Sequence, residues 1–204
     1  MNSDDQPQPD YPMSPLIAGR WSPYAFSDRP VSPDDVRSLF EAARWAPSSY
    51  NEQPWSYILG TKAEPEQYGR VLSCLVEGNQ AWAGAAPVLA IGCTRLTFAR
   101  NGKPNAAAVH DLGLAAGNLC LEATARGLHV HQMIGILPDR VRELFRVPDG
   151  VQPLTGLAIG YAADPDTLDE KYRDRDLAIR GRKPLSEFVF GREWGSAANL
   201  VEST

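Results

Sequence analysis

The stretch "NAAAVHDLGLAAGNLCLEATARGL" (residues 105–128) is the longest helix-like pattern in the chain. Apolar side chains recur in it at spacings of three and four, the period of one helix face; they are Val109, Leu112, Ala116, Leu119 and Ala123. Alanines and glycines surround them, and such small residues let another backbone come close. The pattern predicts either a central core helix or a helix–helix seam shared by two copies of the chain, and it favours neither over the other.

On both sides of this stretch, strand-like and helix-like segments alternate. Helices are predicted from Ser32, a candidate N-cap, to Pro47, and over residues 65–76 and 138–145. Strands are predicted at residues 55–60, 87–94, 128–133 and 154–162. The 87–94 run is almost entirely apolar, as expected of a strand covered on both faces. This alternation indicates a fold of the α/β or α+β class.

The two ends of the chain differ from its middle. Residues 1–14 are acidic and rich in proline, so we expect a flexible arm there. Residues 15–204 are expected to form a single domain with a C-terminal extension that starts at about residue 169. Because residues 169–192 are highly charged, they are expected to be extended.

The amino-acid composition argues against several classes of protein, among them nucleic-acid-binding and membrane-spanning proteins. The 204 residues include 20 basic and 25 acidic side chains, for a net charge of −5, which argues against a nucleic-acid-binding protein. No apolar run approaches the roughly 20 residues that a membrane span needs. The three cysteines lie far apart without a CxxC motif, so we expect buried, reduced thiols in a cytoplasmic protein, with no disulfide framework and no metal site.

Three separated segments carry more hydrogen-bonding groups than a connecting loop needs. Residues 46–55, "APSSYNEQPW", place uncharged polar side chains between two prolines, and residues 19–32 begin with an arginine. Residues 171–184 hold six basic side chains against two acidic ones. Each segment alone is typical of a turn or a solvated charge run. Together they could bind a ligand that combines a phosphate, a polyol and a flat heterocycle.

In sequence order, the motifs of the chain resemble those of the FMN-dependent nitroreductase family, NAD(P)H:flavin/nitro/quinone oxidoreductases. The resemblance runs from Ile17 to Gly195, and its motifs are "RWSPYAF" (20–26), "APSSYNEQPW" (46–55), "GNQAWAGAAPVLAIGC" (78–93), "DLGLAAGNLCLEATARGL" (111–128) and "IRGRKPLSEFVFGREWG" (179–195). It implies an α+β fold, a sandwich in which helices flank a central antiparallel-type sheet. It also implies an intertwined homodimer with FMN at the subunit interface.

The resemblance assigns binding roles to individual residues. Three arginines would hold the FMN phosphate, the 48–51 loop would reach the flavin of the other subunit, and an asparagine would bind the pyrimidine edge. The backbone of Met133 to Gly135 would pass over the ring near N5. The predicted cofactor-binding residues are Arg20, Trp21, Ser22, Tyr24, Pro47, Ser48, Ser49, Asn51, Asn79, Trp82, Met133, Ile134, Gly135, Arg180 and Arg182. No catalytic side chain is predicted, because the flavin N5 would carry the chemistry.

Two positions depart from the family pattern. Tyr24 stands where members usually carry a lysine or arginine, and Trp82 where they often carry a lysine. Fewer cations near the reduced flavin should lower its reduction potential. The alternatives are that the aromatic rings stack on flavin or substrate, and that Arg20 or a backbone N–H supplies the missing stabilisation.

The implied activity is hydride transfer from NAD(P)H through FMN to a nitroaromatic, a quinone or another flavin. One alternative keeps the cofactor but reverses the direction of electron transfer. The protein would then be an FMN oxidase or dehydrogenase that desaturates a small molecule. A second is a non-catalytic flavin-binding protein. The sequence does not choose between NADH and NADPH.

Overall fold

The computed structural model describes residues 9–201. They divide into two compact units, one of residues 13–177 and one of residues 9–12 with 178–201. Residues 1–8 of the predicted arm lie outside the described residues, and residues 9–14 contain no helix or strand. The single domain over residues 15–204 stays a prediction.

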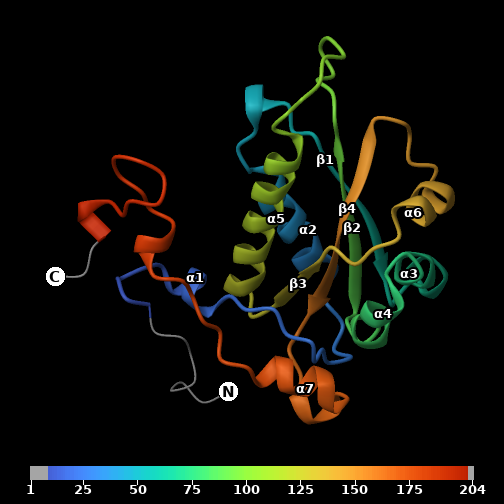
Figure 1. The fold of residues 1–204 in the computed structure, drawn as a ribbon. Helices are drawn as coiled ribbons and strands as arrows, with labels where there is room; N and C mark the ends of the chain where they lie inside the picture. Colours follow the sequence, from blue (N-terminus) through green and yellow to red (C-terminus); the bar gives the residue numbers. More distant parts are fainter. Residues whose placement is uncertain (1–8, 202–204) are drawn as a thin grey trace. The chain divides into compact units, whose positions relative to one another are not determined.

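A four-stranded sheet forms the centre of the larger unit (Figure 1). Its order is β1-β2-β4-β3, and every neighbouring pair is antiparallel. The strands are β1 (Trp55–Thr61), β2 (Val88–Arg95), β3 (His129–Met133) and β4 (Val151–Gly160). The sequence patterns therefore identified all four strands, and the predicted α+β class is confirmed.

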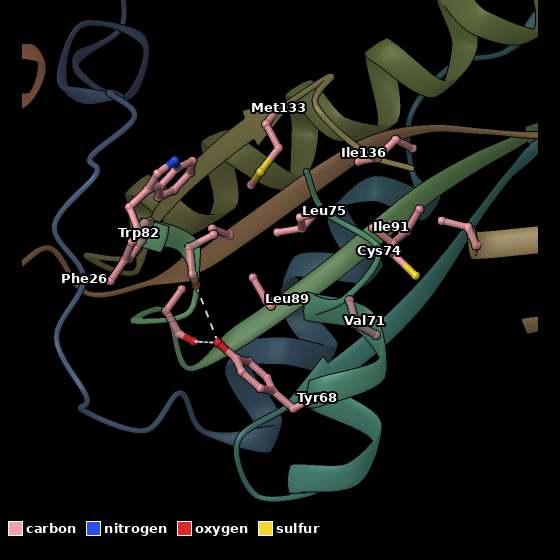
Figure 2. Packing of buried hydrophobic residues seen from close by; sticks show 14 of the residues in the cluster. Phe26, Tyr68, Val71, Cys74, Leu75, Trp82, Leu89, Ile91, Met133 and Ile136 are labelled. Atoms are coloured by element: carbon pink, nitrogen blue, oxygen red, sulfur yellow. Dashed lines mark hydrogen bonds between the residues drawn. The ribbon is translucent and has the colours of Figure 1, made fainter. Parts of the chain in front are cut away.

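Helices cover both faces of this sheet. On one face, α2 (Pro33–Arg44) and α5 (Ala108–Ala125) pack on Val88 and Ala90 of β2. On the other, α3 (Pro65–Leu72), α4 (Glu77–Ala83) and α6 (Pro138–Phe145) pack around Leu89 and Ile91 (Figure 2). Successive side chains of a strand point to opposite faces, so the apolar run in β2 supplies both cores. The predicted sandwich of helices around a sheet is confirmed.

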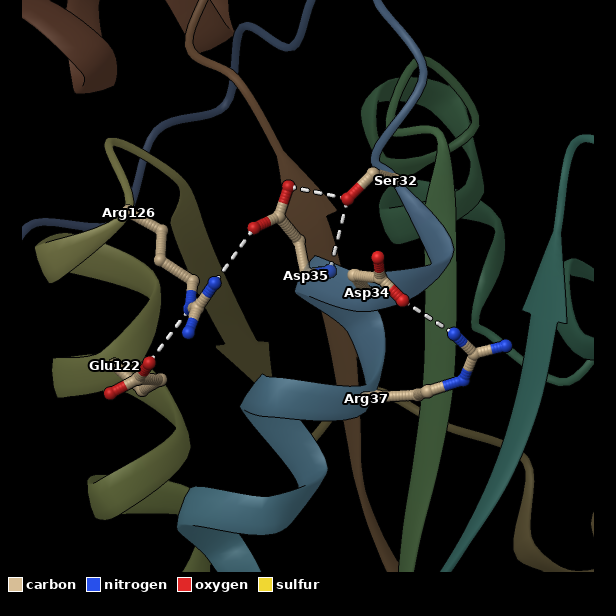
Figure 3. Close-up of polar contacts among 6 residues, drawn as sticks. All are labelled: Ser32, Asp34, Asp35, Arg37, Glu122 and Arg126. Carbon is tan, nitrogen blue, oxygen red and sulfur yellow. Dashed lines mark hydrogen bonds and ion pairs between the residues drawn. The ribbon is translucent and has the colours of Figure 1, made fainter.

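The start of α2 is tied to the end of α5 (Figure 3). Ser32 is the N-cap, and its Oγ accepts a hydrogen bond from the Asp35 backbone N–H at 3.0 Å. Arg126, which follows α5, donates to Asp35 at 3.0 Å and to Glu122 at 2.7 Å. Hydrogen bonds from Ser32 and Arg126 lower the pKa of Asp35. The predicted cap is thus part of a link between two helices.

The charged segment after residue 169 is not extended up to residue 177, and that prediction is wrong there. Glu170–Leu177 form α7, which buries Tyr172 and Asp176 on one face. The Tyr172 hydroxyl donates to the Gly78 carbonyl at 2.7 Å, so the helix is held by tertiary contacts rather than by apolar periodicity. Shorter elements that the patterns did not predict are α1 (Pro15–Gly19), α4, and the 3-10 turns Ser49–Asn51, Pro165–Thr167, Leu185–Glu187 and Asn199–Val201.

The predicted helix over residues 65–76 ends at Leu72. Beyond it, Leu75 forms an isolated β-bridge with Ile136, because this stretch connects to the segment after β3. In residues 9–201, no helix has both the length and the apolar character required to cross a bilayer.

Two glycines near this core predict opposite responses to alanine. A Cβ at Gly160 would lie 2.5 Å from the rigid Pro87 ring, whereas a Cβ at Gly69 in α3 would meet nothing within 4 Å. We expect Gly160→Ala to lower the free energy of unfolding by about 1–3 kcal/mol. Gly69→Ala should raise it by about 0.5–1 kcal/mol, since it removes a mid-helix glycine. Urea denaturation measures both, and equal effects would contradict the packing described here.

Candidate functional site

The segment Arg20–Tyr24 lies against β3. The Trp21 ring meets the His129 ring edge-on, with centroids 5.4 Å apart. His131 donates from Nδ1 to the Pro23 carbonyl at 2.9 Å, and Arg20 donates to the Ser22 hydroxyl at 3.2 Å. Sequence patterns gave no role to either histidine, yet both position residues predicted to bind a cofactor.

Burial keeps the two histidines neutral. It lowers the pKa of His129 and of His131, and the nearby Arg20 charge lowers both further. The bond to Pro23 places the His131 proton on Nδ1, because a carbonyl can only accept. Positive charge in this corner is therefore carried by Arg20, a planar donor suited to a phosphate.

Tyr24 is a partly exposed member of an aromatic cluster. Its ring centroid lies 5.0 Å from that of Trp82, 4.6 Å from that of His131 and 5.7 Å from that of Tyr172. Trp82 itself is only 2% exposed, and its ring contacts in this structure include Tyr24, His131 and Phe26. A direct contact between Trp82 and a cofactor, and a lowered flavin potential, stay predictions.

Asp176 fixes the backbone at Tyr24. One carboxylate oxygen accepts the Tyr24 N–H at 2.5 Å, while the other is buried and has no partner among the described residues. Burial raises the pKa of this carboxyl. Asp176 is not among the predicted site residues, although a buried pair at positions 172 and 176 has the i, i+4 spacing of one helix face.

Asn79 and the backbone after β3 meet at a second corner of the site. The Asn79 amide donates to the Gly135 carbonyl at 2.9 Å, and the Val76 N–H donates to the same carbonyl at 3.1 Å. A Cβ at Gly135 would lie 2.4 Å from Asn79 Nδ2, so a side chain there would require the Asn79 amide to move. Met133 is buried, whereas Ile134 is 72% exposed.

The loop after α2 is held in a strained conformation. Tyr50, Asn51 and Gln53 have φ values of 54°, 56° and 51°, in the left-handed region that residues other than glycine rarely adopt. The Gln53 N–H donates to Ser48 Oγ at 3.0 Å, and the exposed Pro47 precedes the loop. Such strain persists only where surrounding contacts enforce it, and it concentrates at functional sites.

Asp111 anchors this loop to α5. Its carboxylate is buried and accepts the Ser49 N–H at 3.0 Å; its other oxygen lies 3.1 Å from His110 Nδ1. The signal in the sequence is an acidic residue on the apolar face of the 105–128 helix, between Ala108 and Leu112, and the sequence analysis did not use it.

The 47–53 loop and the Arg20–Tyr24 segment lie at opposite ends of α5 (Figure 1). The 47–53 loop is anchored in its first turn by Asp111, whereas His129, which contacts Trp21, follows its last turn. An 18-residue helix is about 27 Å long. A single chain therefore brings Arg20–Tyr24 together with β3, and Asn79 with Gly135, but it does not bring the loop to the Arg20–Tyr24 segment.

Arg180 and Arg182 belong to the smaller compact unit. Arg182 is exposed, and its guanidinium donates to the Gly181 carbonyl at 2.7 Å. Their predicted role at the FMN phosphate stays a prediction. Within residues 9–201, no three histidine, cysteine, aspartate or glutamate side chains gather in a way that could hold a metal ion.

Comparisons with known proteins agree on one family. Residues 17–161 match the sequence model of the Nitroreductase family. A crystal structure of an oxidoreductase containing FMN is 34% identical to the chain with a TM-score of 0.89, covering 96% of this chain and 99% of that one. A nitroreductase family protein from Clostridium difficile 630 is 26% identical with a TM-score of 0.68, covering 87% and 96%.

A curated relative extends the sequence similarity. It is an uncharacterized 15.4 kDa protein in the ask 5′ region of Mycolicibacterium smegmatis, 34% identical over 140 residues, which are 67% of this chain and 90% of that protein.

The histidine pair predicts a loss of stability on acidification. Because the pKa of His129 and of His131 is lowered by folding, the unfolded chain takes up protons first as the pH falls below about 6.5. The free energy of unfolding should be highest above that pH and decrease as the pH falls through the folded-state pKa values. Urea denaturation between pH 8 and 5 should show this slope in the wild type and a reduced slope in His129→Gln/His131→Gln. Identical slopes would contradict the assignment.

Proposed function

The chain belongs to the nitroreductase family, and from that membership we propose that it is an FMN-dependent oxidoreductase that passes hydride from NAD(P)H to a small-molecule acceptor. The acceptor class is a nitroaromatic, a quinone or another flavin. The observation that carries this proposal is the corner in which Asn79 meets the glycine backbone at residue 135. The similarity to an oxidoreductase containing FMN supports it.

The residues present fit FMN. Asn79 uses one amide hydrogen on Gly135, and its oxygen can still accept, so it can meet a heterocycle edge that carries donors and acceptors. Gly135 presents only its backbone at this corner, and an added Cβ there would clash with the Asn79 amide. Ser48, Ser49 and Asn51 are uncharged, which suits a neutral ring, since a charged group beside it would lose hydration without a fixed partner. Arg20 and Ser22 suit the phosphate.

FMN supplies reversible acceptance of hydride, which is why binding and orientation are the tasks left to this chain. Asn79 and the 133–135 backbone would fix the ring, and Arg20, Arg180 and Arg182 would fix the phosphate end. Tyr24, held by Asp176 and packed on Trp82, would limit water at the edge of the site. We assign no protein acid or base, so water or the substrate would provide the proton.

A homodimer is part of the proposal, because one chain does not bring the 47–53 loop to the Arg20–Tyr24 segment. In a second copy, the loop could reach the FMN held by its partner. The outer face of α5 supports such an interface: Gly113 and Gly117 would have nothing within 4 Å of an added Cβ, and Val109 is 47% exposed. A mid-helix glycine costs about 1 kcal/mol relative to alanine, and packing within the chain does not account for it.

We place the protein in the cytoplasm. Cys74, Cys93 and Cys120 are free and buried, which supports a reducing compartment.

Anaerobic stopped-flow reduction tests the proposed function. The purified protein should show the flavin band near about 450 nm, lose it with NADH or NADPH, and regain it with menadione or a nitrofuran. A yellow protein that neither cosubstrate bleaches would be a flavin-binding protein without this activity. Bleaching only by other small organic donors, with return on oxygen, would indicate an oxidase. A colourless protein that ignores added FMN would overturn the proposal.

Gly135→Ala provides a local test of the cofactor corner. The added methyl group would displace the Asn79 amide, so we expect FMN affinity to fall by at least about tenfold while the circular dichroism spectrum is unchanged. Gly78→Ala is the matched control, since it lies next to Asn79 but an added Cβ meets nothing within 4 Å. If both variants retain FMN equally through gel filtration, Gly135 is not part of the site.

A further inference from the structure

A basic hairpin, defined here as residues 96–105, connects β2 to α5. The Phe98 N–H donates to the Lys103 carbonyl at 2.8 Å, Thr97 and Pro104 form an isolated β-bridge, and Gly102 turns the chain with a φ of 67°. Its tip is exposed and includes Arg100 and Lys103. The hairpin therefore presents two cations on a defined turn.

The basic hairpin is fastened to the strained loop of the candidate site. The Tyr50 and Phe98 rings meet edge-on with centroids 5.8 Å apart, and the Ala99 N–H donates to Glu52 Oε1 at 2.5 Å. The Arg100 guanidinium carbon lies 4.3 Å from the Tyr50 ring centroid and 5.2 Å from that of Phe98. The ring contacts thus fix the position of Arg100 beside Tyr50, which is 75% exposed.

The recorded contacts of the Arg100 guanidinium within residues 9–201 are with the Tyr50 and Phe98 rings. An aromatic ring attracts the cation without occupying the five N–H donors of the guanidinium, so these remain available to an anion. The ion pairs formed by residues 9–201 include neither Arg100 nor Lys103. The Glu52 carboxylate, which contacts the hairpin, accepts the Ala99 N–H. In a chain of net charge −5, two cations on a defined turn, neither of them in a recorded ion pair, can attract an anion.

We propose that the basic hairpin binds the phosphates on the adenosine half of the nicotinamide dinucleotide, with Arg100 and Lys103 as its ligands. This inference rests on the proposed function. The nicotinamide has to stack on the flavin, and the 47–53 loop is proposed to contact that flavin, so the rest of the dinucleotide extends over the surface next to the loop. The basic hairpin contacts this loop through Phe98 and Ala99, so its two cations lie beside the expected path of the dinucleotide.

Two phosphate groups could use this site. The pyrophosphate is common to NADH and NADPH, whereas the 2′-phosphate belongs to NADPH alone. A stacked arginine with a neighbouring lysine can bind either, because both present oxygens to charged N–H donors. The chemistry recognised is a phosphate on adenosine, and the choice between the two decides whether the hairpin also selects the cosubstrate.

Isothermal titration of the FMN-loaded protein tests the site without turnover. The probes are adenosine 2′,5′-bisphosphate, ADP and adenosine, and the variants are Arg100→Gln and Arg100→Gln/Lys103→Gln. Arg37→Gln is the matched control, since Arg37 is an exposed arginine in α2 that pairs with Asp34 at 2.5 Å. The KM for NADPH and for NADH is then measured with one acceptor.

The wild type and Arg37→Gln should bind a phosphorylated probe more tightly than adenosine. Arg100→Gln should weaken that binding by at least about tenfold, the double variant should weaken it further, and the FMN content should be unchanged in all. If the hairpin variants raise the KM for NADPH alone, the hairpin binds the 2′-phosphate. If they raise the KM for both cosubstrates, it binds the pyrophosphate.

Three results would overturn the inference: equal probe binding by the double variant and the wild type, an equal loss in Arg37→Gln, or no preference of the wild type for phosphorylated probes. Failure of the proposed function is a separate result, in which the protein lacks FMN or neither cosubstrate reduces it.

Discussion

The uninterrupted length of α5 is the constraint on which the site depends. The helix packs on α2 and the sheet through Ala115, Leu119 and Ala123, and its first turn holds the 47–53 loop through Asp111. Its last turn leads directly into β3, whose histidines hold the Arg20–Tyr24 segment. Because the helix is about 27 Å long, the 47–53 loop and the Arg20–Tyr24 segment do not meet within one chain, and in the proposed homodimer a second copy would complete the site.

Charge is arranged so that few groups near the proposed ring position are ionised. Burial keeps His129 and His131 neutral, and the side chains of Asn79, Ser48, Ser49 and Asn51 are uncharged. Arg20 carries positive charge beside the two histidines, and Arg100 carries it on the basic hairpin. Uncharged side chains beside an arginine suit a ligand that joins a flat neutral ring to a phosphate.

The sequence patterns correctly predicted the helices and strands that are determined by residues close to one another in the sequence. The apolar run of β2, the Ser32 cap of α2 and the period of α5 each depend on neighbouring residues, and each was predicted. The helix α7 was not, because its stability comes from Tyr172 bonding to Gly78, far away in sequence. The same holds in the site, where the sequence indicated which residues could bind a cofactor but not which of them lie together. The contact of Asn79 with Gly135 spans 56 positions in the sequence, and that of Asp176 with Tyr24 spans 152.

Mixing two defective chains tests the two-chain site most directly. Asn51→Gly removes a loop side chain while keeping the left-handed backbone available, and Gly135→Ala disturbs the other part. If the parts act across the interface, a mixed dimer has one intact site and one doubly altered site. Random exchange between equal amounts should then restore about a quarter of the FMN-binding sites. A mixture that binds no more FMN than either variant alone would contradict the account.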